Sequence, residues 1–202
     1  FTALVLDVGQ GQSVALCSGG EFALVDCGSS NSWYSAGGTA GDYLSSMGCR
    51  SLDYLLLTHY DTDHVNGLEE LLSRMEVGAL LLPDTEAGSD TRTRVETLAE
   101  AYAVPVTYVT DLTTLPLGQA EMTVYPPLGD GEESNELGLS LRADCGDFGL
   151  LITGDMDAAT EERLVETYGA ADIDALVAGH HGSKNATSAL LLEAAEPETA
   201  VI

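Results

Sequence analysis

The positions of the histidines constrain this chain more than any other feature. All four histidines fall in two short segments, "HYDTDH" (59–64) and "HH" (180–181), and each segment stands at the end of an apolar run, "LDYLLL" (52–57) or "DIDALVAG" (172–179). Apolar runs of this length, bounded by turn residues, are typical of buried strands. Because α/β folds place their sites at the carboxyl ends of strands, we expect both histidine segments at such ends.

The remaining pattern predicts an α/β fold. In the first half we expect strands at 2–7, 13–17, 21–26 and 52–57, a helix over 39–48, and a second helix from Gly67, where Leu68, Leu71, Leu72 and Met75 share one face. The second half predicts strands at 79–82, 105–109, 121–125, 137–145 and 148–155, helices over 91–103 and 158–168, and an acidic, flexible loop at 126–136. Hairpins combined with strand-helix-strand units predict one domain over residues 1–202, with two mixed sheets between helices.

Charge and composition limit the classes of partner. The chain has 33 acidic and 7 basic residues, a formal net charge of -26. Such a field repels nucleic acid at long range, so a nucleic-acid substrate has to be argued against it. Solubility or a salty habitat is one explanation of the acidity, and metal-binding carboxylates are another. No window approaches a membrane span and the first residues lack the basic start of a signal peptide, so we expect a soluble piece.

The strongest chemical signal is the first histidine segment. His59, Asp61, Asp63 and His64 fall within one loop, and imidazole and carboxylate are usual ligands of Zn, Mn and Fe. Asp155 follows a buried strand in "LLITGD" and is a candidate bridge between two ions, or alternatively a helix N-cap. The four cysteines form no CxxC pair and are expected to be small core residues, with disulfides as the alternative.

Two other aspartates follow predicted strands. We expect Asp26 in "LVDCG" and Asp7 in "LDVGQG" to hold the metal-binding loop by hydrogen bonds, and a direct metal contact for Asp26 is the alternative. The glycines of "GQG" do not match a nucleotide-binding spacing and no helix follows them. They predict a backbone that passes close to the metal site.

The motifs together resemble a known family. "LDVGQGQS", "LVDCG", "LLLTHYDTDHVNG", "SNELGLSL", "LLITGD" and "LVAGHHGSKNATS" occur in the order typical of the metallo-β-lactamase superfamily, and are most similar to the C-terminal hydrolase domain of ComEC-type DNA-uptake channels. The resemblance covers nearly the whole chain and implies an αββα sandwich with the metal site between the edges of two sheets. Members continue past the strand that begins at "TAVI", so we expect either a piece cut from a longer chain or, if the chain ends at Ile202, a sandwich without its last strand and helix.

The resemblance also implies roles for single residues. Two divalent ions would be held by His59, Asp61, Asp63, His64, Asp155 and one histidine of the pair, which we take as His180. Asp63, Asp155 and His181 would be catalytic, with His181 giving a proton to the leaving oxygen or binding a phosphate. Asn135, Ser183 and Lys184 would contact substrate, the last two beside an anion-binding corner of backbone amides at Gly182 and Ser183.

Two departures from the family pattern bear on the metal. Asp61 stands where zinc-rich members carry histidine, and no histidine lies between His64 and His180. Fewer nitrogens and more oxygens favour harder ions, so we expect two ions of Mn or Zn, with Mn preferred. Gln12 stands where ComEC-like members carry aspartate, which weakens the expectation of full activity.

Three functions remain open at this point. The first is a metal-dependent phosphodiesterase that degrades one DNA strand during uptake in competence, with single-stranded DNA as substrate and the membrane-channel part of the same longer polypeptide as partner. Such a domain would be tethered to the outer face of the bacterial membrane, or cytoplasmic if free-standing; no protein partner is indicated. The alternatives are a hydrolase of small esters, lactones or phosphoesters, and a degenerate domain without catalysis.

Overall fold

Two six-stranded sheets form the centre of the computed structural model, which describes residues 1–129, 131 and 134–202. The first sheet has the order β1-β2-β3-β4-β5-β6, with bounds Thr2–Val5, Val14–Ser18, Glu21–Val25, Ser51–Leu56, Glu76–Pro83 and Val106–Val109. The second has the order β12-β11-β10-β9-β8-β7, and from β7 to β12 the bounds are Thr113–Leu117, Ala120–Tyr125, Ser140–Cys145, Phe148–Ile152, Ala175–Val177 and Thr199–Val201. Both sheets mix antiparallel hairpins with parallel strands.

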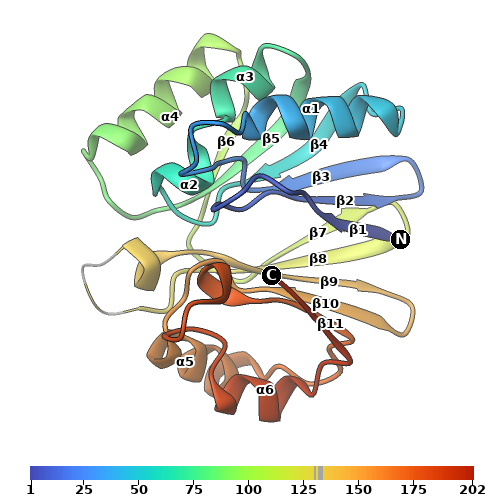
Figure 1. The fold of residues 1–202 in the computed structure, drawn as a ribbon, viewed down its shortest axis with the longest axis vertical. Coiled ribbons are helices and arrows are strands. Elements are labelled where there is room, and N and C mark those ends of the chain that lie inside the picture. Colours follow the sequence, from blue (N-terminus) through green and yellow to red (C-terminus); the bar gives the residue numbers. More distant parts are fainter. Residues whose placement is uncertain (130, 132–133) are drawn as a thin grey trace.

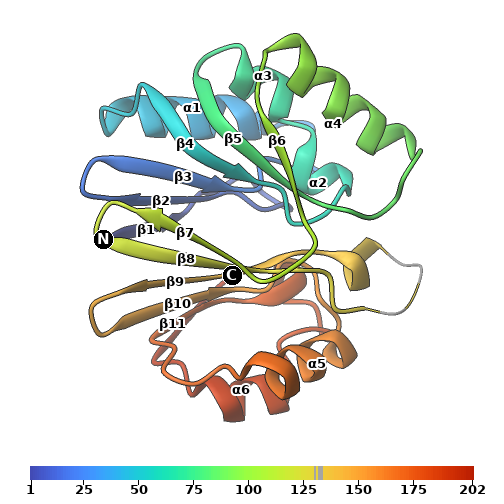
Figure 2. The same ribbon diagram turned by 180° about the vertical axis from the view of Figure 1, so that it is seen from behind.

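Helices cover the outer face of each sheet, as Figures 1 and 2 show. On the first sheet these are α1 (Ala36–Ser46), α3 (Leu68–Leu72) and α4 (Asp90–Ala101), and on the second α5 (Ala158–Tyr168) and α6 (Ala189–Ala195). Shorter turns are α2 (Thr62–Val65), η1 (Ser134–Leu137) and η2 (Gly179–Gly182). Within the described ranges, no helix has the length and apolar character needed to cross a bilayer. The predicted αββα sandwich is confirmed.

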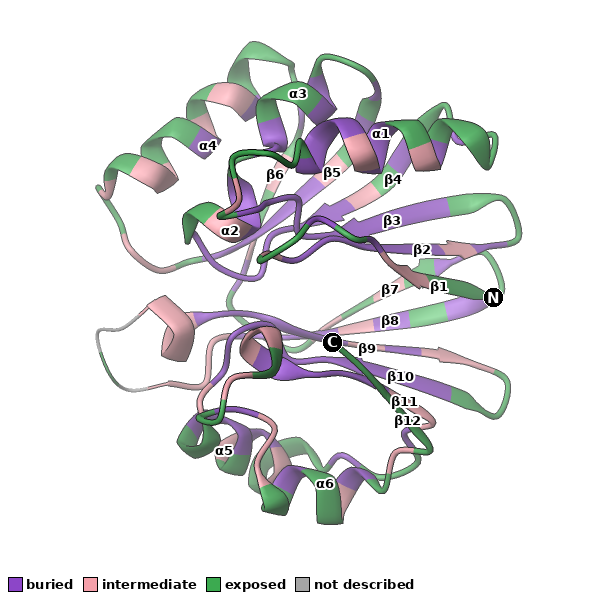
Figure 3. Cartoon of the chain, in the orientation of Figure 1, coloured by how far each residue is buried: buried purple, intermediate pink, exposed green. Residues whose placement is uncertain are grey.

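Apolar side chains fill all three spaces between the four layers. In β2, Val14 and Leu16 lie in the cluster between the sheets, whereas Ala15 belongs to the cluster beneath α1, α3 and α4. A third cluster, with Leu151 and Leu164, lies beneath α5 and α6. Both faces of the central strands are thus buried (Figure 3), which explains their continuous apolar runs. Each fully buried leucine contributes roughly 1.5–3 kcal/mol of transfer free energy to this core.

The cysteines are mostly packing residues. All four are free, so the disulfide alternative does not hold in this structure. Cys27 and Cys49 are buried among apolar side chains, as expected, while Cys17 and Cys145 are partly exposed.

Most predicted elements are confirmed, and the exceptions have identifiable causes. The helix predicted over 158–168 is α5, and the tight turn before β10 contains Gly146 with a positive φ of 62°. Strand β7 was not predicted because Pro116 interrupts the pattern of residues that is typical of strands. Proline lacks the N–H of a ladder hydrogen bond and is tolerated here because β7 lies at the edge of the second sheet.

Three segments differ from expectation in detail. Residues 62–65 form α2, so the histidine segment is partly helical, and α6 was not predicted. The strand that begins in "TAVI" does form, as β12, and pairs in parallel with β11 at the edge of the sheet. In the predicted flexible loop at 126–136, positions 130 and 132–133 lie outside the described residues, while 134–137 form η1.

Parallel pairing brings the polar motifs to one edge. Strands β3 and β4 run in the same direction, and beyond their ends the Asp26 N–H donates to Leu56 O at 2.8 Å. Strands β10 and β11 are also parallel, and beyond them the His180 N–H donates to Gly154 O at 3.0 Å. Leu139 N–H links the two sheets by donating to Thr58 O at 2.7 Å. The carboxyl ends of both sheets therefore face one another.

Candidate metal centre

The first wall of the site is built by the segment after β4. The chain leaves the strand with Thr58 and His59 buried, extends at Asp61 (φ -66°, ψ 148°), and then forms α2. This single helical turn places Asp63 and His64 beside His59, with His64 fully buried. The extended residue followed by a helical turn is what lets closely spaced side chains point to one place.

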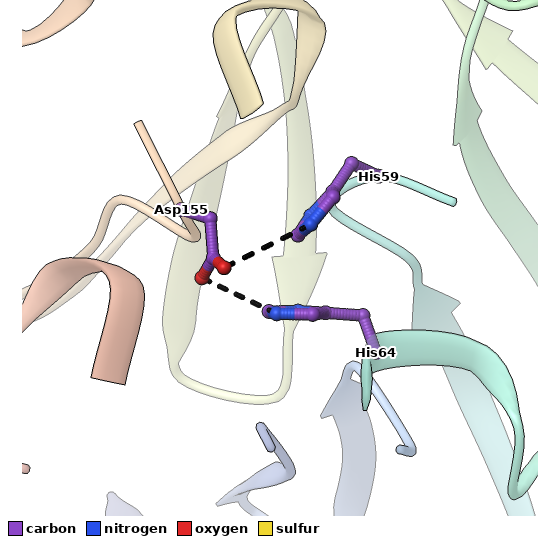
Figure 4. Close-up of side chains that lie close together, drawn as sticks. All are labelled: His59, His64 and Asp155. Carbon is purple, nitrogen blue, oxygen red and sulfur yellow. Dashed lines mark ion pairs between the residues drawn. The ribbon is translucent and has the colours of Figure 1, made fainter. Parts of the chain in front are cut away.

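Two groups of candidate ligands share His64. In the first group, Asp155 lies with one oxygen 4.0 Å from His59 Nε2 and the other 3.2 Å from His64 Nε2 (Figure 4). In the second group, His181 Nε2 lies 3.3 Å from Asp63 Oδ2 and 3.3 Å from His64 Nε2. His181 Nε2 is also 3.5 Å from Asp155 Oδ2, so the two groups form one continuous cluster.

Buried atoms without partners show that this cluster suits a cation. Among the described residues, His59 Nε2 and Asp155 Oδ1 are buried and make no hydrogen bond. Asp155 Oδ1 lies 3.2 Å from His64 Nε2, close enough for an ion pair, but the two atoms do not have the geometry of a hydrogen bond. Leaving such an atom unsatisfied costs about 1–3 kcal/mol. Imidazole nitrogens and carboxylate oxygens converging from two sheets are a donor set that fits divalent metal ions.

Asp26 fixes the orientation of this first wall. Its buried carboxylate accepts hydrogen bonds of 2.7 Å from Gln12 Nε2, from both the N–H and the hydroxyl of Thr58, and pairs at the same distance with His64 Nδ1. Asp26 has a left-handed backbone (φ 59°), which aspartate tolerates better than most residues. Because Nδ1 of His64 is held in this way, its Nε2 is directed into the cluster.

The close backbone predicted from "GQG" is present. A Cβ on Gly11 would lie 2.2 Å from Gly28 O and 2.8 Å from Asp63 O, so only glycine fits between these chains. Gln12 N–H donates to Asp63 O at 3.1 Å. Gln12, which the sequence marked only as a departure, therefore supports the metal loop through both its backbone and its amide. Thr58 was not predicted as part of the site, and its hydroxyl donates to the same Asp26 oxygen as the Gln12 amide.

Neighbouring charges shift the pKa values of the side chains in the cluster. Burial alone would lower the pKa of His64, but Asp26 and Asp155, one beside each ring nitrogen, raise it to about 10. The hydrogen bond from His181 is the main reason that the pKa of Asp63 falls to about 2, and His59 lowers the pKa of Asp61. Burial would raise the pKa of Asp155, but the facing His64 outweighs it and holds that pKa below its usual value. The carboxylates are thus kept ionised and ready to bind a cation.

We expect metal uptake to release about one proton per chain from His64 near pH 8, since its metal-free pKa of about 10 keeps the ring protonated and only the neutral ring can bind metal. The apparent metal affinity should accordingly rise with pH toward that value. Calorimetric titration with Mn²⁺ in two buffers of different ionisation enthalpy measures the released protons. Equal apparent enthalpies in both buffers would contradict a protonated His64.

The second wall is a strained turn after β11. His180 and His181 both have left-handed backbones, with φ of 49° and 50°. Non-glycine residues in this region cost about 1–3 kcal/mol each and persist only where the surroundings impose them. The turn is held by His180 N–H bonded to Gly154 O and by Ser183 N–H bonded to His180 O at 2.8 Å.

A buried carboxylate anchors the other end of this turn. Glu161, fully buried in α5, accepts hydrogen bonds from the N–H groups of Thr187 (2.6 Å) and Ser188 (2.7 Å). Thr187 Oγ1 in turn accepts from Gly179 N–H, directly before the histidines. Sequence analysis missed Glu161, although it shares a helix face with the buried Leu164 three residues on, where a charged residue is unexpected.

Replacing Glu161 with glutamine should destabilise the protein by about 1–3 kcal/mol, because the amide group would face one of the two N–H donors. The melting temperature should fall by roughly 2–10 °C, and metal affinity should fall with it because the histidine turn loosens. Thermal unfolding and metal titration measure both. Glu162→Gln, at the exposed neighbouring position, is the matched control and should change neither. A variant as stable and as tight-binding as the parent would rule out the anchoring role.

The other residues singled out from sequence are not in the cluster. Asp7 is exposed, and among the described residues its carboxylate accepts only from the nearby Gly9 N–H, so it does not hold the metal loop there. Asn135 lies on η1, and the following chain runs beside His59, with a Cβ on Gly138 falling 3.7 Å from that of His59. Lys184 is exposed at the tip of the second wall.

The geometry of the second wall bears on two of the expected roles. The Ser183 N–H already donates to His180 O, so it does not belong to a free anion-binding corner. Within the described chain, the ligand groups include His181 and leave out His180, whose Nε2 lies 3.7 Å from Asp155 Oδ2 with its side chain 37% exposed. The structure therefore brings His181 into the cluster and leaves His180 at its rim.

The fold and the cluster together define a class of protein, the αββα sandwiches in which candidate metal ligands converge at the strand ends of two sheets. The sequence profile of the metallo-beta-lactamase superfamily matches residues 6–202. The chain belongs to the metallo-beta-lactamase superfamily.

Its similar relatives are competence proteins. The chain is 30% identical to Competence protein ComA of Neisseria gonorrhoeae over 200 residues, 98% of this chain and 26% of that one. It is 30% identical to Recombination protein 2 of Haemophilus influenzae over 202 residues (98% and 23%) and 29% identical to ComE operon protein 3 of Bacillus subtilis over 161 residues (79% and 21%). The resemblance to ComEC-like proteins is thus confirmed, and the chain spans about a quarter of these relatives.

Solved structures agree on the fold. CmlA, a diiron beta-hydroxylase from Streptomyces venezuelae, has a TM-score of 0.64 at 19% identity, covering 98% of this chain and 44% of that one. MEM-A1, a subclass B3 metallo-beta-lactamase from a soil metagenome library, has a TM-score of 0.60 at 14% identity, covering 89% and 77%. At these identities the likeness shows the shared sandwich alone.

Proposed function

We propose that this chain is a metal-dependent phosphodiesterase that degrades one strand of DNA during DNA uptake. The observation that carries the proposal is the buried cluster itself, in which His59 Nε2 and Asp155 Oδ1 have no hydrogen-bond partner and face other ligand atoms. The names of the relatives, a competence protein and a recombination protein among them, direct the choice of substrate toward DNA.

We assign the ligands to two divalent ions. The first wall would contribute His59, Asp61, Asp63 and His64, and the second sheet would contribute Asp155 and His181. When bound, such ions supply Lewis acidity, making water more acidic and neutralising charge on phosphate oxygens. Carboxylates are as numerous as imidazoles in this set, which favours Mn over Zn.

His180 takes the role of proton donor in this proposal. Its ring stands at the rim, half-exposed, with Nε2 3.7 Å from Asp155 Oδ2. A group at that place can give a proton to the leaving oxygen of a substrate that reaches the cluster from outside. The roles of His180 and His181 are thus the reverse of those first taken from the sequence. Asn135 and Lys184 remain candidates for contacts with the substrate on either side.

The charge of the chain is compatible with DNA only through bound metal. Four arginines are paired with carboxylates: Arg74 with Asp42, Arg92 with Asp84 and Glu96, Arg94 with Glu69, and Arg142 with Asp144. These cations are neutralised by their own neighbours. Positive potential for a phosphate must therefore come mainly from ions held in the cluster.

The proposed setting follows from the relatives. Because the chain matches about a quarter of each competence protein, we propose that it acts as one domain, residues 1–202, of a longer polypeptide whose remainder forms a membrane channel. Single-stranded DNA leaving or entering that channel on the outer face of the membrane would be the substrate.

A substrate panel tests the proposal. The metal-free chain is reconstituted with Mn²⁺, Zn²⁺ or Mg²⁺ and given bis(p-nitrophenyl) phosphate, single-stranded DNA, p-nitrophenyl acetate, a lactone and a chromogenic β-lactam. We expect both phosphodiesters to be cleaved, fastest with Mn²⁺. Hydrolysis of the acetate or lactone with both phosphodiesters left intact would replace this function with the second candidate, a small-ester hydrolase, which the paired arginines favour.

A further inference from the structure

Two neighbouring aromatic residues are exposed in a loop that follows β3 of the first sheet. Trp33, the single tryptophan of the chain, is 92% exposed, and Tyr34 is 41% exposed. We call these two residues the aromatic lip. They belong to the loop between β3 and α1, at the carboxyl edge of the first sheet where the ligands gather. Burying a large apolar side chain is worth about 1.5–3 kcal/mol, so packing in the core does not explain why this indole stays in water.

The lip is presented by a fixed backbone. Trp33 N–H donates to Asn31 Oδ1 at 3.0 Å, and Tyr34 N–H donates to Asn31 O at 3.0 Å. Behind this turn, the Ser29 hydroxyl donates to Val8 O at 2.5 Å. These bonds hold the main chain, so the indole projects from an ordered loop rather than from a frayed one.

Contacts lead from the lip directly to a candidate ligand. The ring of Tyr34 lies against Gly9, where a Cβ would fall 3.0 Å from the ring. Gly9 belongs to the turn of residues 8–12, which also accepts the Ser30 N–H at Gln10 O (2.7 Å). The same turn ends with Gln12 N–H bonded to Asp63 O. The lip therefore borders the first wall of the cluster through one intervening turn.

The negative charge of the chain limits the kind of ligand that the aromatic lip can bind. Four of the seven basic residues are paired with carboxylates and the net charge is -26, so contacts that need no protein cation would contribute more to holding a DNA strand than they do in a basic protein. Stacking of a base on an aromatic ring needs no charge, and every base has a face that can stack. A flat, exposed indole in the loop that borders the first wall is therefore suited to stack on an unstacked base of a strand bound at the cluster.

We propose that the aromatic lip is a nucleobase-stacking subsite that holds the single-stranded substrate at the metal centre. This inference rests on the proposed phosphodiesterase function and names the way in which that site selects nucleic acid. It also implies a weak salt dependence, because few counterions are released when a base stacks on an uncharged ring.

Intrinsic fluorescence tests binding at the lip directly, because Trp33 is the sole tryptophan. The Mn²⁺-loaded chain is titrated with an oligothymidylate and with an abasic strand of equal length, and the fluorescence is read before cleavage sets in. We expect saturable quenching by the oligothymidylate, none by the abasic strand, and a slope of log affinity against log salt of smaller magnitude than about one. Equal quenching by both strands, or no quenching at strand concentrations that saturate cleavage, overturns the proposal.

Kinetics separate the lip from the catalytic centre. Trp33→Ala should raise KM for single-stranded DNA about tenfold, within the range measured for loss of one base stack, and leave kcat for bis(p-nitrophenyl) phosphate unchanged. Trp33→Phe should restore most of the loss. Tyr102→Ala is the control: this tyrosine is 42% exposed, much as Tyr34 is, and lines a hollow beside Glu76 and Val77 at the opposite end of β5.

The two possible failures are distinguishable. Unchanged KM for DNA in Trp33→Ala overturns the stacking subsite while leaving the phosphodiesterase intact. Absence of bis(p-nitrophenyl) phosphate hydrolysis in the parent chain instead overturns the proposed function, whatever the fluorescence shows. A tenfold rise in KM for Tyr102→Ala as well would assign the effect to the general surface and also overturn the subsite.

Discussion

Replacing Asp155 with asparagine is expected to abolish hydrolysis, lowering kcat by about 10³-fold or more, equivalent to roughly 4 kcal/mol of barrier. The two oxygens of Asp155 lie within 3.2 to 4.0 Å of ring nitrogens from all four histidines, so this carboxylate is the one group that both sheets share. Asparagine keeps the shape but loses the charge and one acceptor. Rates with bis(p-nitrophenyl) phosphate and the number of bound ions per chain measure the effect.

The matched control for Asp155 lies two residues further on. Asp157 is also an aspartate after β10, but its carboxylate accepts from Thr160 N–H and serves as the N-cap of α5. Asp157→Asn should therefore retain the activity, since asparagine is also a good N-cap. If Asp155→Asn keeps a rate within tenfold of the parent, the cluster is not the catalytic centre.

Asp26→Asn is expected to have the largest effect on stability, about 3–5 kcal/mol, with metal affinity reduced roughly 10- to 100-fold. Asparagine tolerates the left-handed backbone at this position, so the loss isolates the carboxylate. Its amide nitrogen would face donors that now bond to Oδ2, including the Gln12 amide and the Thr58 hydroxyl, and would leave His64 Nδ1 without its ionic partner.

Urea unfolding of the metal-free chain and competition with a metal indicator measure these two effects. Asp53→Asn is the control, because the Asp53 carboxylate lies in the same sheet and accepts only the Phe22 N–H among the hydrogen bonds of the described residues. It should cost no more than about 1 kcal/mol and leave metal affinity unchanged. Equal losses of stability and of metal affinity in the two variants would contradict the role of Asp26 in orienting His64.

Local patterns in the sequence were sufficient for most of the fold. Two-sided burial of the central strands produces unbroken runs such as Leu55 to Leu57, which sequence analysis interprets correctly as strand. The edge strand β7 was missed because Pro116 is acceptable only at an edge, and edge position is a property of the assembled sheet.

The candidate ligands of the first wall could also be found from a local pattern in the sequence. His59, Asp61, Asp63 and His64 are close in sequence, so one loop had to bring them together. The support of Asp26 by Gln12 and Thr58, and of the second wall by Glu161, joins residues 14 to 32 positions apart and depends on tertiary packing. The different positions of the His180 and His181 side chains follow from their two successive left-handed backbone conformations, which the sequence alone does not predict.

The most direct test of the central claim is the rate at which the metal-free chain cleaves end-labelled single-stranded DNA as Mn²⁺ is added. With ions held by His59, Asp61, Asp63, His64, Asp155 and His181, we expect no cleavage in chelator and a rate that rises to a plateau at about two ions per chain. Cleavage that persists in chelator would contradict the claim. So would a chain that binds both ions and leaves the DNA and bis(p-nitrophenyl) phosphate intact.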